Sequence, residues 1–154
     1  METVQWEVKP FEALTVFELY EILQLRSEIF VVEQNCVYQD LDFKDYKSWH
    51  LMGKINHQVV AYSRLFDAGQ YFEYTSIGRV TVNAQYRAMK MGHALIVESK
   101  KQIKNLFGTT NITISAQLYL KKFYEQHGFV ATSDVYLEDD IEHVEMKLSS
   151  NWGV

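Results

Sequence analysis

The sequence of 154 residues contains little cysteine or proline and no excess of basic residues. Its single cysteine, Cys36, excludes an internal disulfide. Fifteen Lys and Arg against twenty Asp and Glu give a net charge of −5, so the broad basic surface of a nucleic-acid-binding protein is missing. No apolar run is long enough to cross a bilayer, and the N-terminus lacks the pattern of a secretion signal. We therefore expect a reduced, cytoplasmic protein that binds neither nucleic acid nor membranes.

The residues that are present suit one globular domain. The composition is 47% hydrophobic and 23% charged, which is typical of a folded chain with a single packed core at this length. We find no repeat, no low-complexity tract and no Ser/Gly-rich linker. The sequence therefore predicts one domain over residues 1–154.

Hydrophobic periodicity predicts a mixture of helices and strands of the α+β type. Thr15 and Glu18 form a capping-box pattern before a helix over Val16–Val32, and the polar segment Glu33–Lys47 predicts a long loop with a helical turn. Two more helices are expected at Met91–Leu106 and Leu118–His127. Strands are expected at Val4–Val8, Ser48–Ile55, Gln58–Phe66, Phe72–Val82, Asn111–Ser115, Phe129–Val135 and His143–Leu148, with an acidic turn at Leu137–Asp140.

A possible phosphate site lies between Arg79 and Ser99. A β-branched strand there leads through a turn into a helix whose first turn holds Gly92. This order points free backbone N–H groups and the positive end of a helix dipole at the space before the turn. We interpret the segment as a pyrophosphate cradle, although a lone glycine at a helix start is weak evidence by itself.

Two runs of residues resemble motifs of the GNAT superfamily of N-acetyltransferases. The run RVTV-N-x-x-YRAMKMGHAL is similar to the acetyl-CoA loop of that family, R/Q-x-x-G-x-G/A after a strand, with Arg87 at the first position and Gly92 at the last. Ala88 and Lys90 stand where glycines are common in the pattern. The run AQLYLKKFYEQHGF resembles the second motif, in which a helix bearing tyrosine leads into a Gly-Phe strand. The runs RSEIFVVEQNCVYQDLDFKD and IEHVEM extend the likeness, over nearly the whole chain, to the small bacterial ElaA-type branch.

The resemblance implies a fold, a co-substrate and an acceptor. The fold is a mixed, largely antiparallel twisted sheet of about six to seven strands flanked by about four helices. The co-substrate is acetyl-CoA, the acceptor is a primary amine of a small molecule or peptide, and a homodimer is compatible with the family. Five histidines without ligand spacing give a metal little support. The residues assigned to CoA are Val80, Thr81, Val82, Arg87, Ala88, Met89, Lys90, Met91, Gly92, His93, Gln117 and Tyr124.

Attack of a neutral amine on a thioester requires a base, a donor for the oxyanion and a group that protonates or hydrogen-bonds the sulfur. Following the resemblance, we assign the sulfur to Tyr124, although helical spacing alone favours a ring buried in the core. The backbone N–H of Val82 or a neighbour would hold the oxyanion, with Gly78 marking a bulge that frees it from the sheet.

The base and the acceptor contacts stay open. Candidates for attracting a cationic amine are Glu33, Asp40 and Asp42, and candidates for accepting its proton through water are Glu28 and His50. Arg26, on an apolar helix stripe, must pair with a carboxylate, either of the substrate or of the protein, where Glu33 and Asp40 are the nearest candidates. The predicted substrate contacts are therefore Arg26, Glu33, Asp40 and His50.

Two classes of function fit these residues. The first is a CoA-dependent N-acetyltransferase, and the second is a noncatalytic acyl-CoA-binding or sensing module, which the altered loop at Ala88 and Lys90 suggests. An acyl-homoserine-lactone synthase, which shares a similar core but is usually longer, is a third alternative.

Overall fold

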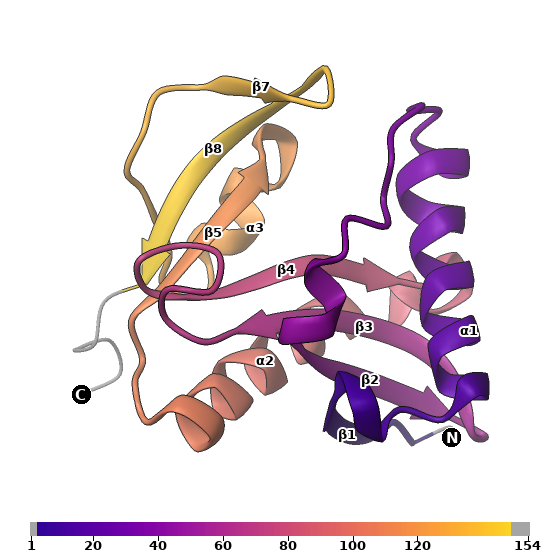
Figure 1. Cartoon of the computed structure of the whole chain (residues 1–154). Coiled ribbons are helices and arrows are strands. Elements are labelled where there is room, and N and C mark those ends of the chain that lie inside the picture. Colours follow the sequence, from indigo (N-terminus) through magenta and orange to yellow (C-terminus); the bar gives the residue numbers. More distant parts are fainter. Residues whose placement is uncertain (1–2, 149–154) are drawn as a thin grey trace.

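The computed structural model describes residues 3–148, which form a twisted sheet of eight strands with helices on both faces (Figure 1). The strand order is β1-β2-β3-β4-β5-β8-β6, with β7 paired to β8. All pairs are antiparallel except β4–β5. The predicted fold class is confirmed, and one further short strand, β7, brings the seven predicted strands to eight. The strands are β1 (Gln5–Pro10), β2 (Trp49–Ile55), β3 (Gln58–Phe66), β4 (Thr75–Val82), β5 (Ile112–Gln117), β6 (Val130–Ala131), β7 (Tyr136–Glu138) and β8 (Ile141–Leu148).

Three α-helices and several short turns complete the fold. The α-helices are α1 (Val16–Arg26), α2 (Met91–Phe107) and α3 (Lys121–Glu125), and α1 continues into the π-helical segment η2 (Ser27–Glu33). The 3-10 turns are η1 (Phe11–Ala13), η3 (Lys44–Lys47), η4 (Ala84–Met89) and η5 (Leu118–Leu120). Within residues 3–148 no helix combines the length and the hydrophobicity that crossing a bilayer requires.

The predicted capping box begins α1. The Glu18 N–H donates to Thr15 Oγ1 at 3.0 Å, and the Thr15 N–H donates to Glu18 Oε1 at 2.9 Å. The end of the helix differs from the expectation. After Arg26 the hydrogen bonds widen to the π type, as in the bond from the Cys36 N–H to the Val31 carbonyl. Such widened turns are frequent at functional sites, and this one lies beside the cleft described below.

The core has two layers because alternate residues of the central strands face opposite sides. Leu51 and Ala61 pack in one cluster with Leu95 and Ile96 of α2, whereas Met52 packs in a second cluster with Ile22 of α1. In Figure 1, α1 accordingly lies in front of the sheet and α2 behind it. Both clusters surround β3 and hold it as the rigid centre of the molecule.

The sheet splits between β4 and β5. These parallel strands pair only at Thr75 with Ile112 and at Ser76 with Thr113. Beyond this point the strands diverge, as the V between them shows in Figure 1. The second half of β4 therefore has a hydrogen-bonded partner, β3, on one side only.

The C-terminal region departs most from the expected elements. The helix expected over Leu118–His127 begins as the 3-10 turn η5 and is α-helical only in α3, and the strand expected over Phe129–Val135 shrinks to β6. The turn expected over Leu137–Asp140 is also wrong, because its first half belongs to β7. Only Asp139 and Asp140 turn the chain, with left-handed φ values of +52° and +62°. Two successive left-handed residues make a tight hairpin turn, which aspartate tolerates better than most residues.

Candidate functional site

The free side of β4 forms one wall of a cleft. The Asn83 N–H donates to the Val60 carbonyl at 2.8 Å, so the alternation of an antiparallel ladder places Val82 at a position whose N–H and C=O point away from β3. Arg87 Nε donates a hydrogen bond to the Val82 carbonyl oxygen at 3.3 Å. The Val82 backbone therefore faces the gap between β4 and β5, as its predicted role requires.

A bulge interrupts β4 just before this edge. Gly78 pairs with Arg64 and Thr81 pairs with Tyr62, so Arg79 and Val80 together face the one residue between them on β3. The predicted bulge is present, but the left-handed residue is Arg79, with φ +51°, and not the glycine before it. Such a conformation costs about 1–2 kcal/mol in a residue with a side chain. Ion pairs of the Arg79 guanidinium, described below, hold the residue in place.

The start of α2 has the geometry of an anion site. Lys90 adopts the left-handed conformation, φ +57°, at the position where the family pattern has glycine, so the turn keeps its shape without one. The structure gives no acceptor within residues 3–148 for the N–H groups of Met91, Gly92 and His93. Together with the helix dipole, these three N–H groups favour an anion in front of α2.

An ion pair spans the mouth of this anion site. Arg87 donates through both terminal nitrogens to the Glu33 carboxylate, at 2.9 and 2.7 Å. The two side chains are 44% and 41% exposed. Glu33 was a candidate partner of Arg26, and this pairing shows that it serves Arg87 instead.

A hollow in front of α2 collects most of the residues predicted to bind CoA. Those that line it are Val80, Thr81, Val82, Arg87, Lys90, Gly92, His93 and Tyr124, together with Glu33. Ala88, Met89 and Met91 do not line it, and the Met91 side chain is instead buried in the core. The residues that the sequence did not indicate are Ile29, Gln34, Tyr119, Leu120 and Phe123.

Tyr124 lies where two parts of the cleft meet. It lines both the hollow in front of α2 and a second cavity between β4 and β5. The rings of Phe123 and Phe129 pack edge-on against it, at centroid distances of 5.1 and 5.9 Å. Burial raises the pKa of the phenol above its usual value, so Tyr124 remains protonated at neutral pH and able to donate a hydrogen bond.

The second cavity contains polar residues that sequence reasoning missed. Its lining includes Tyr38, Ser115, Glu138 and His143, besides the predicted Gln117. The amide of Gln117 is paired with that of Gln34, at 3.0 and 3.3 Å. The two-residue Asp139-Asp140 turn places residues 136, 138, 141 and 143 on one face of the hairpin, which brings Glu138 and His143 to the cavity.

Arg26 belongs to a buried cluster of ion pairs. Its guanidinium donates to Asp40 Oδ2 at 2.9 Å and to Asp45 Oδ1 at 2.7 Å, and the side chain is 0% exposed. Of the two internal partners proposed for it, Asp40 is confirmed and Glu33 is wrong. Arg64 binds Asp45 and Asp42, and Arg79 binds Asp40 and Asp42. The ion-pair cluster therefore consists of Arg26, Asp40, Asp42, Asp45, Arg64 and Arg79.

His50 lies beside the ion-pair cluster and is 1% exposed. Its ring bonds to the Tyr62 hydroxyl at 2.7 Å and lies 3.0 Å from the Asp45 carbonyl, and burial lowers its pKa. Arg26, Asp40 and His50 do not line either part of the cleft. Their predicted contact with substrate is therefore corrected to a structural role, because internal partners already satisfy these buried groups.

The comparisons with known proteins agree with this geometry. The family model described as "Acetyltransferase (GNAT) domain" matches residues 24–150 of the chain. The chain is 36% identical over 145 residues to protein ElaA of Escherichia coli strain K12, covering 93% of this chain and 95% of that protein. It is 39% identical over 150 residues to a UPF0039 protein of Schizosaccharomyces pombe, covering 96% and 99%. A crystal structure of an acyl-CoA N-acyltransferase from Pseudomonas aeruginosa superposes with a TM-score of 0.90 at 40% identity, covering 96% of this chain and 100% of that chain. The chain therefore belongs to the GNAT acetyltransferase family, in the branch that holds ElaA and the UPF0039 proteins.

Proposed function

We propose that the protein is an acetyl-CoA-dependent N-acetyltransferase that transfers the acetyl group to a primary amine of a small molecule or peptide by direct attack. One observation carries the proposal. A cleft runs from the free amides at the start of α2, along the unpaired side of β4, to the protonated phenol of Tyr124. The Pseudomonas aeruginosa structure, an acyl-CoA N-acyltransferase, supports the same class of reaction.

The residues present suit the parts of acetyl-CoA. The N–H groups of Met91, Gly92 and His93 would hold the diphosphate, and the side chains of Arg87 and Lys90 would add positive charge around it. The Val82 C=O points into the cleft, where an extended pantetheine arm would donate a hydrogen bond to it as an added strand does. This arm would lead the thioester towards Tyr124.

Two groups of the chain suit the acyl transfer itself. The Val82 N–H would stabilise the negative charge that develops on the thioester oxygen, since it has no partner on β3. Tyr124 would donate its hydroxyl proton in a hydrogen bond to the sulfur as the carbon–sulfur bond breaks. Its raised pKa keeps that proton in place until the thiolate forms.

The test is release of free thiol from acetyl-CoA in the presence of single amines. Spermidine, glucosamine, Nα-acetyl-lysine and an alanyl tripeptide represent the acceptor classes that the sequence leaves open. We expect at least one of them to accelerate thiol release in proportion to the protein concentration, with the acetylated amine found by mass spectrometry.

The same experiment separates the noncatalytic alternative. A sensing module would bind acetyl-CoA in calorimetry but release no thiol with any amine. The altered loop that suggested this alternative keeps the required turn, because Lys90 itself takes the left-handed conformation. The geometry therefore favours the enzyme.

A further inference from the structure

We propose that the acceptor is a cationic primary amine, and that Glu138 and His143 receive it and remove its proton. The inference rests on the proposed function and deepens it by naming the substrate class and the base. Both residues line the cavity between β4 and β5 that Tyr124 also lines. An amine held there would approach the thioester from the side opposite to the α2 hollow, which is the direction that attack requires.

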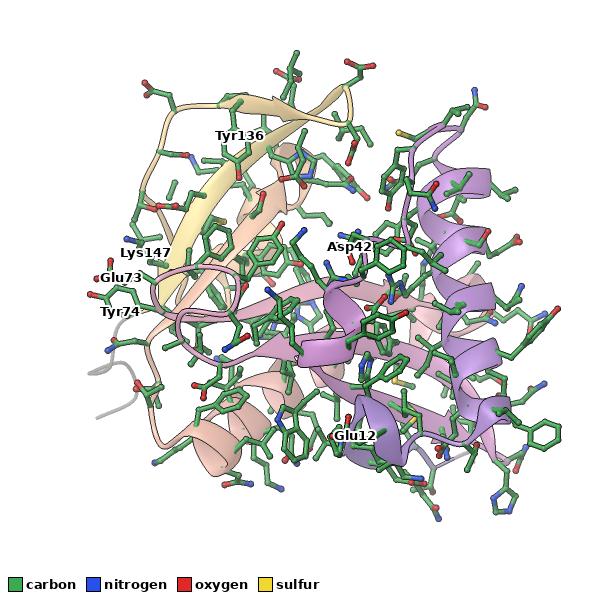
Figure 2. All side chains as sticks on the ribbon, in the orientation of Figure 1. Glu12, Asp42, Glu73, Tyr74, Tyr136 and Lys147 are labelled. Atoms are coloured by element: carbon green, nitrogen blue, oxygen red, sulfur yellow. The ribbon has the colours of Figure 1, made fainter. Side chains whose placement is uncertain are left out.

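The β7–β8 hairpin builds this end of the cavity. Tyr136 pairs with His143 and Glu138 pairs with Ile141, so all four side chains lie on the same face of the hairpin. The rings of Tyr136 and His143 stack with their planes 22° apart. Figure 2 shows the Tyr136 ring pointing from β7 towards β5, where its hydroxyl meets Ser115. The hairpin therefore holds the Glu138 and His143 side chains at the end of the cavity.

The hydrogen bonds of His143 identify the atom that can accept a proton. Nδ1 lies 2.7 Å from the Ile141 carbonyl oxygen, which can only accept, so Nδ1 must carry a hydrogen. Nε2 of the neutral ring is then a lone pair, and it lies 3.5 Å from Glu138 Oε2. The Nε2 lone pair and the carboxylate oxygen are both hydrogen-bond acceptors, and a proton placed on Nε2 would turn their contact into an ion pair. The pair is therefore built to take up one proton.

Glu138 carries a negative charge that the protein does not neutralise. Ser115 donates to Oε1 at 3.2 Å and fixes the carboxylate, but within residues 3–148 no Lys or Arg forms an ion pair with it. Asp40, Asp42 and Asp45, by contrast, each bind arginine. The Glu138 side chain is 40% exposed, so an incoming ammonium group can reach it. An unpaired carboxylate at the end of a cavity attracts a cation and disfavours a carboxylate-bearing acceptor.

Other titratable groups surround this pair. Those that line the cavity with it or interact with its neighbours are Tyr38, Tyr71, Arg79, Tyr119, Tyr124, Tyr136, Asp139 and Glu145. Burial raises the pKa of Tyr38, Tyr71, Tyr124 and Tyr136, which therefore stay neutral near pH 7. Arg79 is held by Asp40 and Asp42. Glu138 and His143 are the pair of this set that places a carboxylate oxygen beside a ring nitrogen lone pair, so together they can bind an ammonium group and accept its proton.

The proposed reaction releases one proton for each acetyl group transferred. The ammonium group binds the Glu138 carboxylate and loses one proton to His143 Nε2, which later passes it to solvent. The freed lone pair of nitrogen forms the carbon–nitrogen bond, the carbon–sulfur bond breaks, and the second nitrogen proton replaces the one that Tyr124 gives to sulfur. The products are the acetamide, CoA thiol and one released proton.

The test compares Glu138→Gln and His143→Gln with the exposed control Glu142→Gln, using the most active amine of the panel. Glu138→Gln should raise the KM for that amine at least tenfold and also lower kcat, because it removes the charge that binds the cation. His143→Gln should lower kcat about 100-fold with little change in KM and should remove the acidic limb of the kcat profile against pH. Glu142→Gln should behave like the wild type, because its side chain points away from the cavity.

A second measurement does not depend on the natural acceptor. Butylammonium chloride, added to the protein saturated with CoA, should shift the NMR signals of Ser115 and His143, and Glu138→Gln should weaken this binding at least fivefold. Failure of the wild-type protein to bind CoA would contradict the proposed function. Normal CoA binding and turnover with wild-type KM and pH profile in both variants, or no butylammonium binding, would overturn this inference alone.

Discussion

Two polar regions of the molecule lie on either side of β4 and differ in how their groups are satisfied. In the ion-pair cluster, three arginines meet three aspartates, and every carboxylate has a guanidinium within 3.0 Å. In the cleft, the N–H groups that begin α2, the Val82 N–H and the Glu138 carboxylate lack such partners in the described part of the chain. Buried groups with internal partners support structure, whereas groups left without partners beside a cavity are available to a ligand.

The ion-pair cluster still serves the cleft, although Arg79 is its one member that lines the cavity between β4 and β5. Arg26 comes from α1, Asp40 and Asp42 from the loop after η2, Arg64 from β3 and Arg79 from the bulge of β4. Figure 2 shows Asp42 where this loop crosses the sheet in front of β4. The cluster thus ties the loop to the strained residue beside the unpaired edge of β4.

The largest effect should come from breaking the cluster. Arg26→Met leaves two buried carboxylates short of a cation and should lower the free energy of unfolding by about 3–5 kcal/mol. Urea denaturation followed by circular dichroism measures this change. Arg87→Met is the matched control, because its ion pair is half exposed and should cost no more than about 1 kcal/mol. Equal losses in the two variants would contradict the distinction between the regions.

Tyr124→Phe tests the cleft with a change that leaves its shape intact. Removing the hydroxyl should lower kcat about 100-fold, the usual contribution of a positioned acid. The Kd for CoA should stay within about threefold, because under the proposed function the hydroxyl would contact only the sulfur. Thiol release and calorimetry measure the two quantities, and Tyr20→Phe on the exposed face of α1 is the control. A large loss of CoA affinity with unchanged kcat would reverse the assignment.

The same contrast explains how far the sequence could predict the molecule. Local signals were sufficient where one segment determines the feature, as in the capping box at Thr15, the helix that begins after Lys90 and the bulge near Gly78. Side-chain partners were predictable only in part. Asp40 was expected as a partner of Arg26, but Arg26 also meets Asp45, and Glu33 meets Arg87, through contacts between distant elements. When the ion-pair partner of a charged residue is not known from the sequence, the residue is easily assigned to a binding site.

The failure to predict the Glu138–His143 pair has a more specific cause. Glu138 was assigned to a turn, and a turn residue has no defined face. Two left-handed aspartates shorten that turn and place Glu138 beside His143 on the hairpin. Asp-Asp lacks the glycine that usually marks a two-residue hairpin turn, so the register of β7 and β8 was not visible in the sequence.

Gly92→Asp should have an intermediate effect. The new carboxylate would stand among the N–H groups proposed to bind the diphosphate, and it should weaken CoA binding at least tenfold, about 1.4 kcal/mol. Stability should not fall, because an acidic residue suits the start of a helix. Gly92→Ala separates charge from bulk, since a Cβ there meets the Phe123 ring at an ordinary 3.6 Å. Calorimetry giving wild-type affinity for the aspartate variant would show that the diphosphate binds elsewhere.

The smallest expected effect concerns the ion pair across the mouth of the cleft. The Glu33 carboxylate accepts hydrogen bonds from both terminal nitrogens of Arg87, which a diphosphate would also use as donors. Glu33→Gln should therefore free the guanidinium and tighten CoA binding about two- to fivefold. Glu28→Gln removes the same charge from the same segment without touching Arg87, and it should leave the affinity unchanged. Weaker CoA binding in Glu33→Gln would mean that Glu33 positions Arg87 for the phosphates. In that case the exposed pair would belong with the ion-pair cluster, as a support that a ligand does not displace.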